Sequence, residues 1–234
     1  MPDQQPSPQA PERSSIVRDG VAVGLATGAY GVSFGAVSVA GGLDVVQTCV
    51  LSLLVFTGAS QFAFVGVVAS GGAPISGAMT ALLLGSRNTL YGLRLAPLLA
   101  LRGRRRVAAA HLLIDESTAM AVNRDSTAAA RVGFLSTGLA VFVFWNLATF
   151  AGALAGTALG DPRTYGLDAA VGGAFLALLW PRLDTPLNRL VGVLAVVLAL
   201  GLVPVTTAGV PVLAAATVAL LAGALAGLPA RRRG

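Results

Sequence analysis

Long apolar runs follow one another along most of this 234-residue chain, separated by short stretches rich in arginine, glycine and proline. A helix needs about 20 apolar residues to cross a bilayer. The strands of an outer-membrane barrel would instead alternate polar and apolar positions. The runs therefore predict an all-α fold, a polytopic transmembrane helical bundle of about seven membrane segments. The candidate segments are 20–42, 45–69, 75–100, 132–159, 167–179, 190–203 and 210–228.

The composition supports this class of protein. Hydrophobic residues make up 55% of the chain, charged residues 11%, and the mean hydropathy is +0.78. The net charge of +6 does not indicate nucleic-acid binding, because the basic residues form short blocks between apolar runs. Arginine-rich loops of membrane proteins lie on the cytoplasmic side. This rule places there Arg13, Arg18, Arg102, Arg104, Arg105, Arg106, Arg182, Arg189 and residues 231–233.

The chain divides into three parts on the same grounds. Residues 1–18 are rich in proline, glutamine and serine, which predicts a disordered cytoplasmic tail. Residues 19–229 form the transmembrane domain, and residues 230–234 form a basic cytoplasmic C-terminus. Cys49 is the only cysteine, which excludes an internal disulfide and a thiolate-rich metal site. We expect no metal and no cofactor.

Arg87 and Asn88 interrupt the apolar run 75–100, and Arg94 interrupts it again. An arginine at membrane depth costs roughly 2.5 to 3.5 kcal/mol on insertion scales, so it normally faces a partner, a cavity or a substrate. A snorkelling side chain or a structural ion pair is the alternative interpretation. The placement indicates a transporter or a channel.

The charge pattern restricts how this run crosses the membrane. If Arg18 and the block 102–106 are both cytoplasmic, an even number of crossings separates them, and the two preceding runs already supply two. The run 75–100 would then enter and leave as two short helices, 75–86 and 88–100. Such broken helices expose backbone groups to substrate in transporters. The alternative is one full crossing, with 111–123 returning as another helix and the block 102–106 outside.

A short internal similarity links the two halves of the chain. Residues 42–56 and 166–180 share a Gly-Leu-Asp start followed by apolar residues at identical offsets. Glycines spaced by four, which let helices pack closely, also recur in both halves. Internal repeats are common in secondary transporters. A duplication and a coincidence of apolar patterns are both compatible with this similarity.

One polar patch lies in the second apolar run. Thr57 and Gln61 are four apart and share a helix face beside the small residues Gly58 and Ala59. A glutamine amide can donate to the carboxylate and accept from the ammonium of a small zwitterion. An interhelical hydrogen bond, worth about 0.6 kcal/mol, is the alternative.

The only histidine and two acids form a second polar group. His111 and Asp115 are four apart in the run 107–122, which predicts one shared helix face. Desolvation favours the neutral form of a carboxyl group, so Asp115 and Glu116 are candidate proton carriers. If Arg87 faces one of them, protonation would release the pair and let the bundle move. A solvated helix face for the acids and an interfacial position for His111 are the alternatives.

Together these segments resemble a known family. The sequences GVSFG at 31–35, SLLVFTGASQF at 52–62, LLLGSRNTLYG at 82–92 and DES at 115–117 are similar, in the same order, to the AzlC family, the large subunit of branched-chain amino acid exporters. The resemblance implies a multi-pass permease of the inner (plasma) membrane. It implies export of leucine, isoleucine, valine and often methionine, driven by the membrane potential or the proton gradient. It also implies a small hydrophobic partner subunit of the AzlD type.

Carried over position by position, the resemblance assigns site residues. It implies proton coupling by Asp115 and Glu116, and substrate binding by Phe56, Gly58, Gln61, Phe62, Arg87, Asn88 and Tyr91. Family members often have an asparagine or a similar residue just before the arginine, where this chain has Gly85 and Ser86. Trp145 and Asn146 rank below these residues, because a tryptophan inside a helix usually serves packing.

Other functions compete with a transporter. Residues 58–62 begin like a GxSxG nucleophile motif, but Phe62 stands where the second glycine is required, which argues against an enzyme. A channel, or a non-transporting membrane assembly subunit, would bury the same polar groups. Removing both Asp115 and Glu116 would spare flux through a channel and abolish uphill export.

Overall fold

The computed structural model describes residues 10–159, 176, 179–180, 183–207 and 209–227. Within these ranges the regular structure is helical and no strand occurs, which confirms the all-α prediction for them. The helices are α1 (Ala10–Ala40), α2 (Val45–Leu54), α3 (Gly58–Ala69), α4 (Pro74–Gly85), α5 (Arg87–Leu99), α6 (Gly103–His111), α7 (Asp115–Val122), α8 (Thr127–Leu159), α10 (Pro186–Leu202) and α11 (Val210–Gly227).

Among the described residues, two helices are long and apolar enough to cross a membrane. They are α1, with 31 residues, and the segment Thr127–Ala158 of α8. The helices α2, α3, α10 and α11 are apolar but shorter. Much of the predicted bundle is therefore built from half-length helices rather than from full spans.

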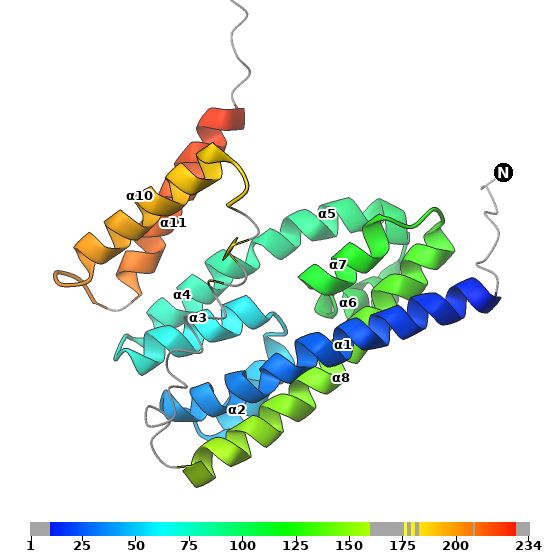
Figure 1. Cartoon of the computed structure of the whole chain (residues 1–234), viewed down its shortest axis with the longest axis horizontal. Helices are drawn as coiled ribbons and strands as arrows, with labels where there is room; N and C mark the ends of the chain where they lie inside the picture. Colours follow the sequence, from blue (N-terminus) through cyan, green and yellow to red (C-terminus); the bar gives the residue numbers. More distant parts are fainter. Residues whose placement is uncertain (1–9, 160–175, 177–178, 181–182, 208, 228–234) are drawn as a thin grey trace, which may run out of the picture.

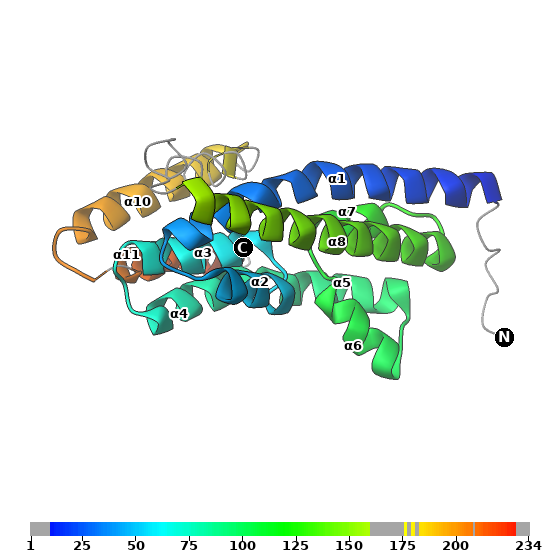
Figure 2. The same ribbon diagram turned by 90° about the horizontal axis from the view of Figure 1, so that it is seen from below.

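The helices α1 and α8 lie side by side over most of their own length (Figures 1 and 2). Glycines on both helices make this contact close. A methyl group on Gly35 would collide with the carbonyl oxygen of Thr149, and one on Gly152 would collide with that of Val32. Small residues at four-residue spacing permit this approach of two backbones. The pair forms the long wall on which α2, α3, α5 and α7 pack.

The second apolar run does not cross the molecule. It breaks at residues 55–57, and α3 runs back towards the end from which α2 came. Ser52 of α2 lies 3.4 Å, oxygen to oxygen, from Thr149 on α8, whereas the far end of α3 at Ala69 lies against Gly41. The helices α2 and α3 thus form a V whose tip reaches the middle of the molecule.

A second V enters from the opposite end. It consists of α6 and α7, with its tip at residues 112–114. Leu112 at the tip packs on Gly138 in the middle of α8, and Met120 near the end of α7 packs on Gly133. The rings of Phe56 and His111 are 6.0 Å apart, so the two tips meet.

Between the two V-shaped pairs, α4 and α5 run through the molecule head to tail. They meet at Ser86, close to the predicted break, but they continue in one direction instead of turning back (Figure 1). The expectation that the run 75–100 enters and leaves on one side is therefore wrong. The head-to-tail path of α4 and α5 fits a single pass of this run, but 111–123 does not return as one helix, because α6 ends at His111 and α7 spans Asp115–Val122. The run 45–69 turns back instead. If α1 and α4–α5 each cross the membrane once, Arg18 and the block 102–106 lie on the same side, which stays a prediction.

Three other predictions differ from the structure or lie outside the described residues. Helix α1 begins at Ala10, so residues 10–18 are helical and not a disordered tail, while residues 1–9 lie outside the described residues. His111 ends α6 and Asp115 begins α7, so the two do not share a helix face. The second copy of the apparent repeat, 166–180, falls almost wholly outside the described residues, as does most of the candidate segment 167–179.

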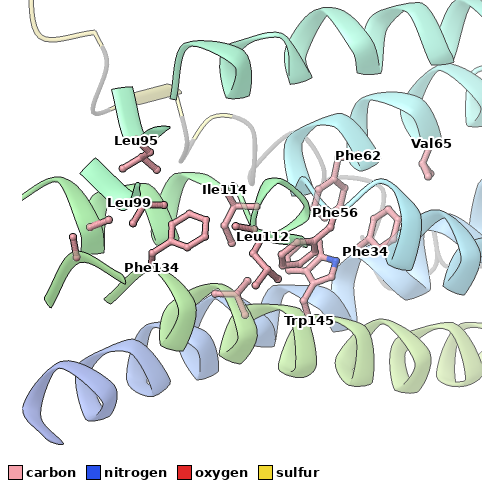
Figure 3. Packing of buried hydrophobic residues seen from close by; sticks show 14 of the residues in the cluster. Phe34, Phe56, Phe62, Val65, Leu95, Leu99, Leu112, Ile114, Phe134 and Trp145 are labelled. Carbon is pink, nitrogen blue, oxygen red and sulfur yellow. The ribbon is translucent and has the colours of Figure 1, made fainter. Parts of the chain in front are cut away.

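The hairpin of α10 and α11 stands beside this body and touches it through α11 and α4 (Figure 1). No side chain of α10 is buried, although the helix is rich in leucine and valine. The buried hydrophobic cluster lies instead in the body, where side chains from α1, α3, α5 and α8 converge on the two tips (Figure 3).

Candidate substrate site

A partly open cavity of about 320 Å³ lies where the two tips meet, and α1, α5 and α8 also contribute to its lining. We call it the central cavity. The α2–α3 break and the start of α3 contribute Phe56, Gly58 and Phe62, among others. The other V contributes Ile114, Asp115 and Glu116, α5 contributes Arg87, and α8 contributes Val141 and Trp145. The wall is thus apolar on one side and charged on the other.

Gln61 holds the break between α2 and α3 in place. Its amide nitrogen donates to the carbonyl oxygens of Val55 at 2.6 Å and Ser52 at 3.2 Å, and its amide oxygen accepts from the indole nitrogen of Trp145 at 3.0 Å. The side chain is fully buried. These bonds satisfy backbone groups that the break removes from the helix. Gln61 lies behind the cavity wall and positions it.

Ser117 has the same role at the other tip. Its hydroxyl group donates to the carbonyl oxygen of Leu112 at 2.7 Å and accepts from the amide of Ile114 at 3.1 Å. The turn places Asp115 and Glu116 in the first turn of α7, where the helix dipole stabilises negative charge. Both acids line the central cavity.

Arg87 and Asp115 form an ion pair across the cavity. One guanidinium nitrogen, Nη2, lies 2.8 Å from Oδ2 of the carboxylate, and the two side chains are 32% and 30% exposed. Within the described residues, Arg87 Nε and Asp115 Oδ1 are buried and have no hydrogen-bond partner. The pair therefore uses one nitrogen and one oxygen of groups that can form two parallel bonds.

Asn88 and Tyr91 lie outside the central cavity. The amide nitrogen of Asn88 donates to the carbonyl oxygen of Leu113 at 3.0 Å, and the side chain lines a second cavity between α5 and α6. Tyr91 is partly buried on α5 and lines neither of these two cavities. Asn88 thus joins α5 to the second tip, next to the ion pair.

Aromatic rings pack around the apolar side of the central cavity (Figure 3). The ring of Phe62 meets that of Phe34 edge to face at 5.3 Å and the indole of Trp145 at 6.4 Å. Phe56 packs against Phe142 at 5.0 Å. A methyl group on Gly58 would lie 3.1 Å from the Trp145 ring, so the glycine leaves room for the indole.

Six of the nine residues proposed from the sequence line the central cavity: Phe56, Gly58, Phe62, Arg87, Asp115 and Glu116. Gln61, Asn88 and Tyr91 do not. Trp145, ranked lower, lines it directly, as do Thr27 and Tyr30 of α1. The sequence signal for Trp145 is the polar interruption that it forms with Asn146 in the apolar run 132–159, whereas nothing in the glycine-rich sequence of α1 distinguishes Thr27.

Comparison with known proteins supports one family. The sequence model of the AzlC protein family matches residues 22–159, which include both tips and the whole central cavity. No curated protein and no solved structure matches the chain.

Proposed function

Because the chain belongs to the AzlC family, a family of membrane transporters, we propose that it exports branched-chain amino acids across the inner membrane. The observation that carries the proposal is the partly exposed Arg87–Asp115 ion pair at the central cavity. An arginine at membrane depth normally faces a functional partner. Here the partner is Asp115, and the two charged groups of a zwitterionic amino acid can replace both members of the ion pair.

The substrate's charges match those of the cavity. Its carboxylate can form two parallel bonds with Nε and Nη2 of Arg87, of which Nε has no partner within the described residues. Its ammonium group then takes the place of the guanidinium beside Asp115, and Glu116 lines the same wall. Binding exchanges one ion pair for two, so no charge is left buried alone.

The size and lining of the cavity favour a single aliphatic amino acid. About 320 Å³ is at the lower end of the range for ligand pockets, roughly 300 to 1,000 Å³, which leaves no room for a peptide. Phe62, Val141 and Trp145 offer an apolar surface for a branched side chain. One methylene changes affinity by only about 1 to 3 kcal/mol, so leucine, isoleucine, valine and methionine are all candidate substrates.

Two acids and one arginine also suit proton coupling. When Arg87 pairs with Asp115, Glu116 is a second carboxyl group within the same wall. A proton taken up by one of the acids would weaken the hold on the guanidinium or on the substrate ammonium. Such a protonation step would shift a carrier between its two conformations, whereas a channel needs no such step.

A small hydrophobic subunit of the AzlD type is part of the proposal. The uncovered apolar surface of α10, with no buried side chain, supports such a partner in the bilayer. The structure contains one chain, so the partner must be supplied in any functional assay.

The decisive experiment is efflux of preloaded labelled leucine from cells that lack their own exporter and express the chain with its AzlD-type partner. We expect efflux in the wild type and its loss in Arg87→Ala. Arg94→Ala is the matched control, because Arg94 is exposed on the same helix. Equal efflux from Arg87→Ala and Arg94→Ala at equal abundance would remove Arg87 from the mechanism. No leucine efflux from an inserted wild-type complex would refute the branched-chain assignment.

A further inference from the structure

Within the described residues, two further cavities follow the central cavity along the molecule, one on each side. The cavity between α5 and α6, of about 430 Å³, lies at the end that carries Arg106. We call it the arginine-end cavity. Another, of about 660 Å³, lies between α3, α4 and the turn from α10 to α11. We call it the hairpin cavity. Figure 3 shows the order: Leu95, Leu99 and Phe134 of the arginine-end cavity lie on one side of Ile114 and Phe56, and Phe62 lies on the other.

Phe62 separates the central cavity from the hairpin cavity. It lines both of them, and it is 6% exposed. Its ring is supported from behind by Phe34 and Trp145. From Phe62 the hairpin cavity continues along the same face of α3, past Gly66 to Ser70 at the end of that helix. A rotation of one ring would therefore connect the two cavities.

Asn88 and Leu113 separate the central cavity from the arginine-end cavity. Both residues line the arginine-end cavity, and their chain neighbours Arg87 and Ile114 line the central one. The 3.0 Å bond from the Asn88 amide to the Leu113 carbonyl oxygen closes this boundary. The ion pair of Arg87 with Asp115 makes a second link between the same two elements.

We propose that the three cavities form one substrate route along the molecule, closed at Phe62 on the hairpin side and at the Asn88–Leu113 contact on the arginine side. The inference rests on the proposed function, since it assigns the outer cavities to the same amino acid. Asn88 and Phe62 are the gates of this route. Asn88 therefore takes part in transport although it does not line the central cavity.

The polar atoms at the arginine-side gate support a contact that opens. Arg87 Nε, Asn88 Oδ1 and Asp115 Oδ1 are all buried without a hydrogen-bond partner within the described residues. A substrate bound beside this gate would supply partners for Arg87 Nε and Asp115 Oδ1, since buried unpaired polar groups are unfavourable. The same substrate would break the ion pair and leave the Asn88 bond in place between α5 and the second tip.

Thiol labelling tests the route without requiring transport. Cys49 is the only cysteine, so Cys49→Ser gives a cysteine-free chain. Thr27→Cys then places a thiol on the wall of the central cavity. A charged, membrane-impermeant thiol reagent is applied to each side of sealed vesicles that contain the chain and its partner. Phe62→Ala is compared with Phe64→Ala, which makes the same change on α3 at a residue that lines none of the three cavities. Asn88→Ala is compared with Asn146→Ala on α8.

We expect Phe62→Ala to raise labelling of the central thiol about tenfold from the hairpin side only, and Asn88→Ala to do so from the arginine side only, because opening a minor state of a few per cent allows such a gain. Labelling equal to that of the two controls, or raised equally from both sides, would overturn the proposal. If Phe62→Ala does not accumulate, Phe62→Leu replaces it. Side-specific labelling that leucine does not reduce would keep the route and contradict the amino-acid assignment.

Discussion

The amide of Gln61 makes three hydrogen bonds, and all of them stay within the bundle. From spacing alone, substrate binding and an internal bond were equally open for this residue. The sequence could not decide, because the partners Val55 and Trp145 become neighbours only through the break at 55–57. Arg87 differs, since its charge alone required a partner at that depth, and Asp115 was among the acids named for it.

The first prediction concerns Gln61→Leu. The substitution removes the hydrogen bonds to the Ser52 carbonyl and to the Trp145 indole nitrogen, at about 1 to 3 kcal/mol for each buried group, whereas the Val55 carbonyl keeps its bond from the Thr57 amide. We expect a large fall in the thermal stability of the purified protein in detergent. Gln47→Leu serves as control, because Gln47 is exposed and only caps α2. Equal stability of the two variants would mean that Gln61 does not hold the break.

A second prediction concerns the two acids. The double variant Asp115→Asn, Glu116→Gln keeps the shape of the cavity wall but cannot release or take up a proton there. We expect uphill export driven by a proton gradient to be abolished, while downhill exchange of leucine persists at a lower affinity because Asp115 no longer holds the substrate ammonium. Asp125→Asn, at an exposed position, should behave as the wild type. Uphill export that survives in the double variant would place the coupling group elsewhere.

At the scale of helices, the breaks show what the sequence can and cannot predict. The break near Ser86 was predictable, because Arg87 and Asn88 interrupt an apolar run. The break at 55–57 was missed, because the run 45–69 stays apolar and its lost backbone bonds are replaced by Gln61, from the next helix. The break at 112–114 was missed for the same reason, with Ser117 as the replacement. The hydrophobicity of a segment indicates that the segment is buried, but it does not indicate the direction in which the chain turns.

The third prediction concerns the contact of α1 with α8. Gly35→Ala would drive a methyl group into the carbonyl oxygen of Thr149, which is backbone and cannot move away alone. We expect a loss of about 1 to 3 kcal/mol, as for other overpacked cores, seen as a lower unfolding temperature and lower abundance. Gly201→Ala on α10 meets nothing within 4 Å and should be neutral or slightly stabilising. A neutral Gly35→Ala would contradict the close contact.

For the whole molecule, the fourth prediction concerns which parts share a side of the membrane. In the Cys49→Ser chain, Ser70→Cys and Arg104→Cys place single thiols at opposite ends of the molecule. An impermeant reagent added to intact cells should label the thiol at position 70 and spare the one at position 104, since arginine-rich segments stay inside. Labelling of both positions from outside would contradict the arrangement of two V-shaped pairs that enter from opposite ends.

The sequence predicts the helical class of the whole molecule, but it does not predict the path that the chain takes through the bundle. Continuous apolar runs and arginine blocks are local properties, so the helical class and the family were accessible from them. The even number of passes between Arg18 and the block 102–106 stays a prediction. The sequence did not show which of the apolar runs turns back, because that depends on the contact between residues 56 and 111 across the bundle.

The closely packed glycines of α1 and α8 limit the ways in which the molecule can change shape. A slide of one helix along the other by a single residue, about 1.5 Å, would move each glycine out of register with the backbone that it faces. The two helices must therefore travel as one rigid body. Any change between conformations that face opposite sides falls to the V-shaped pairs and to α4–α5, whose joint at Ser86 lies next to the only arginine that the central cavity contains.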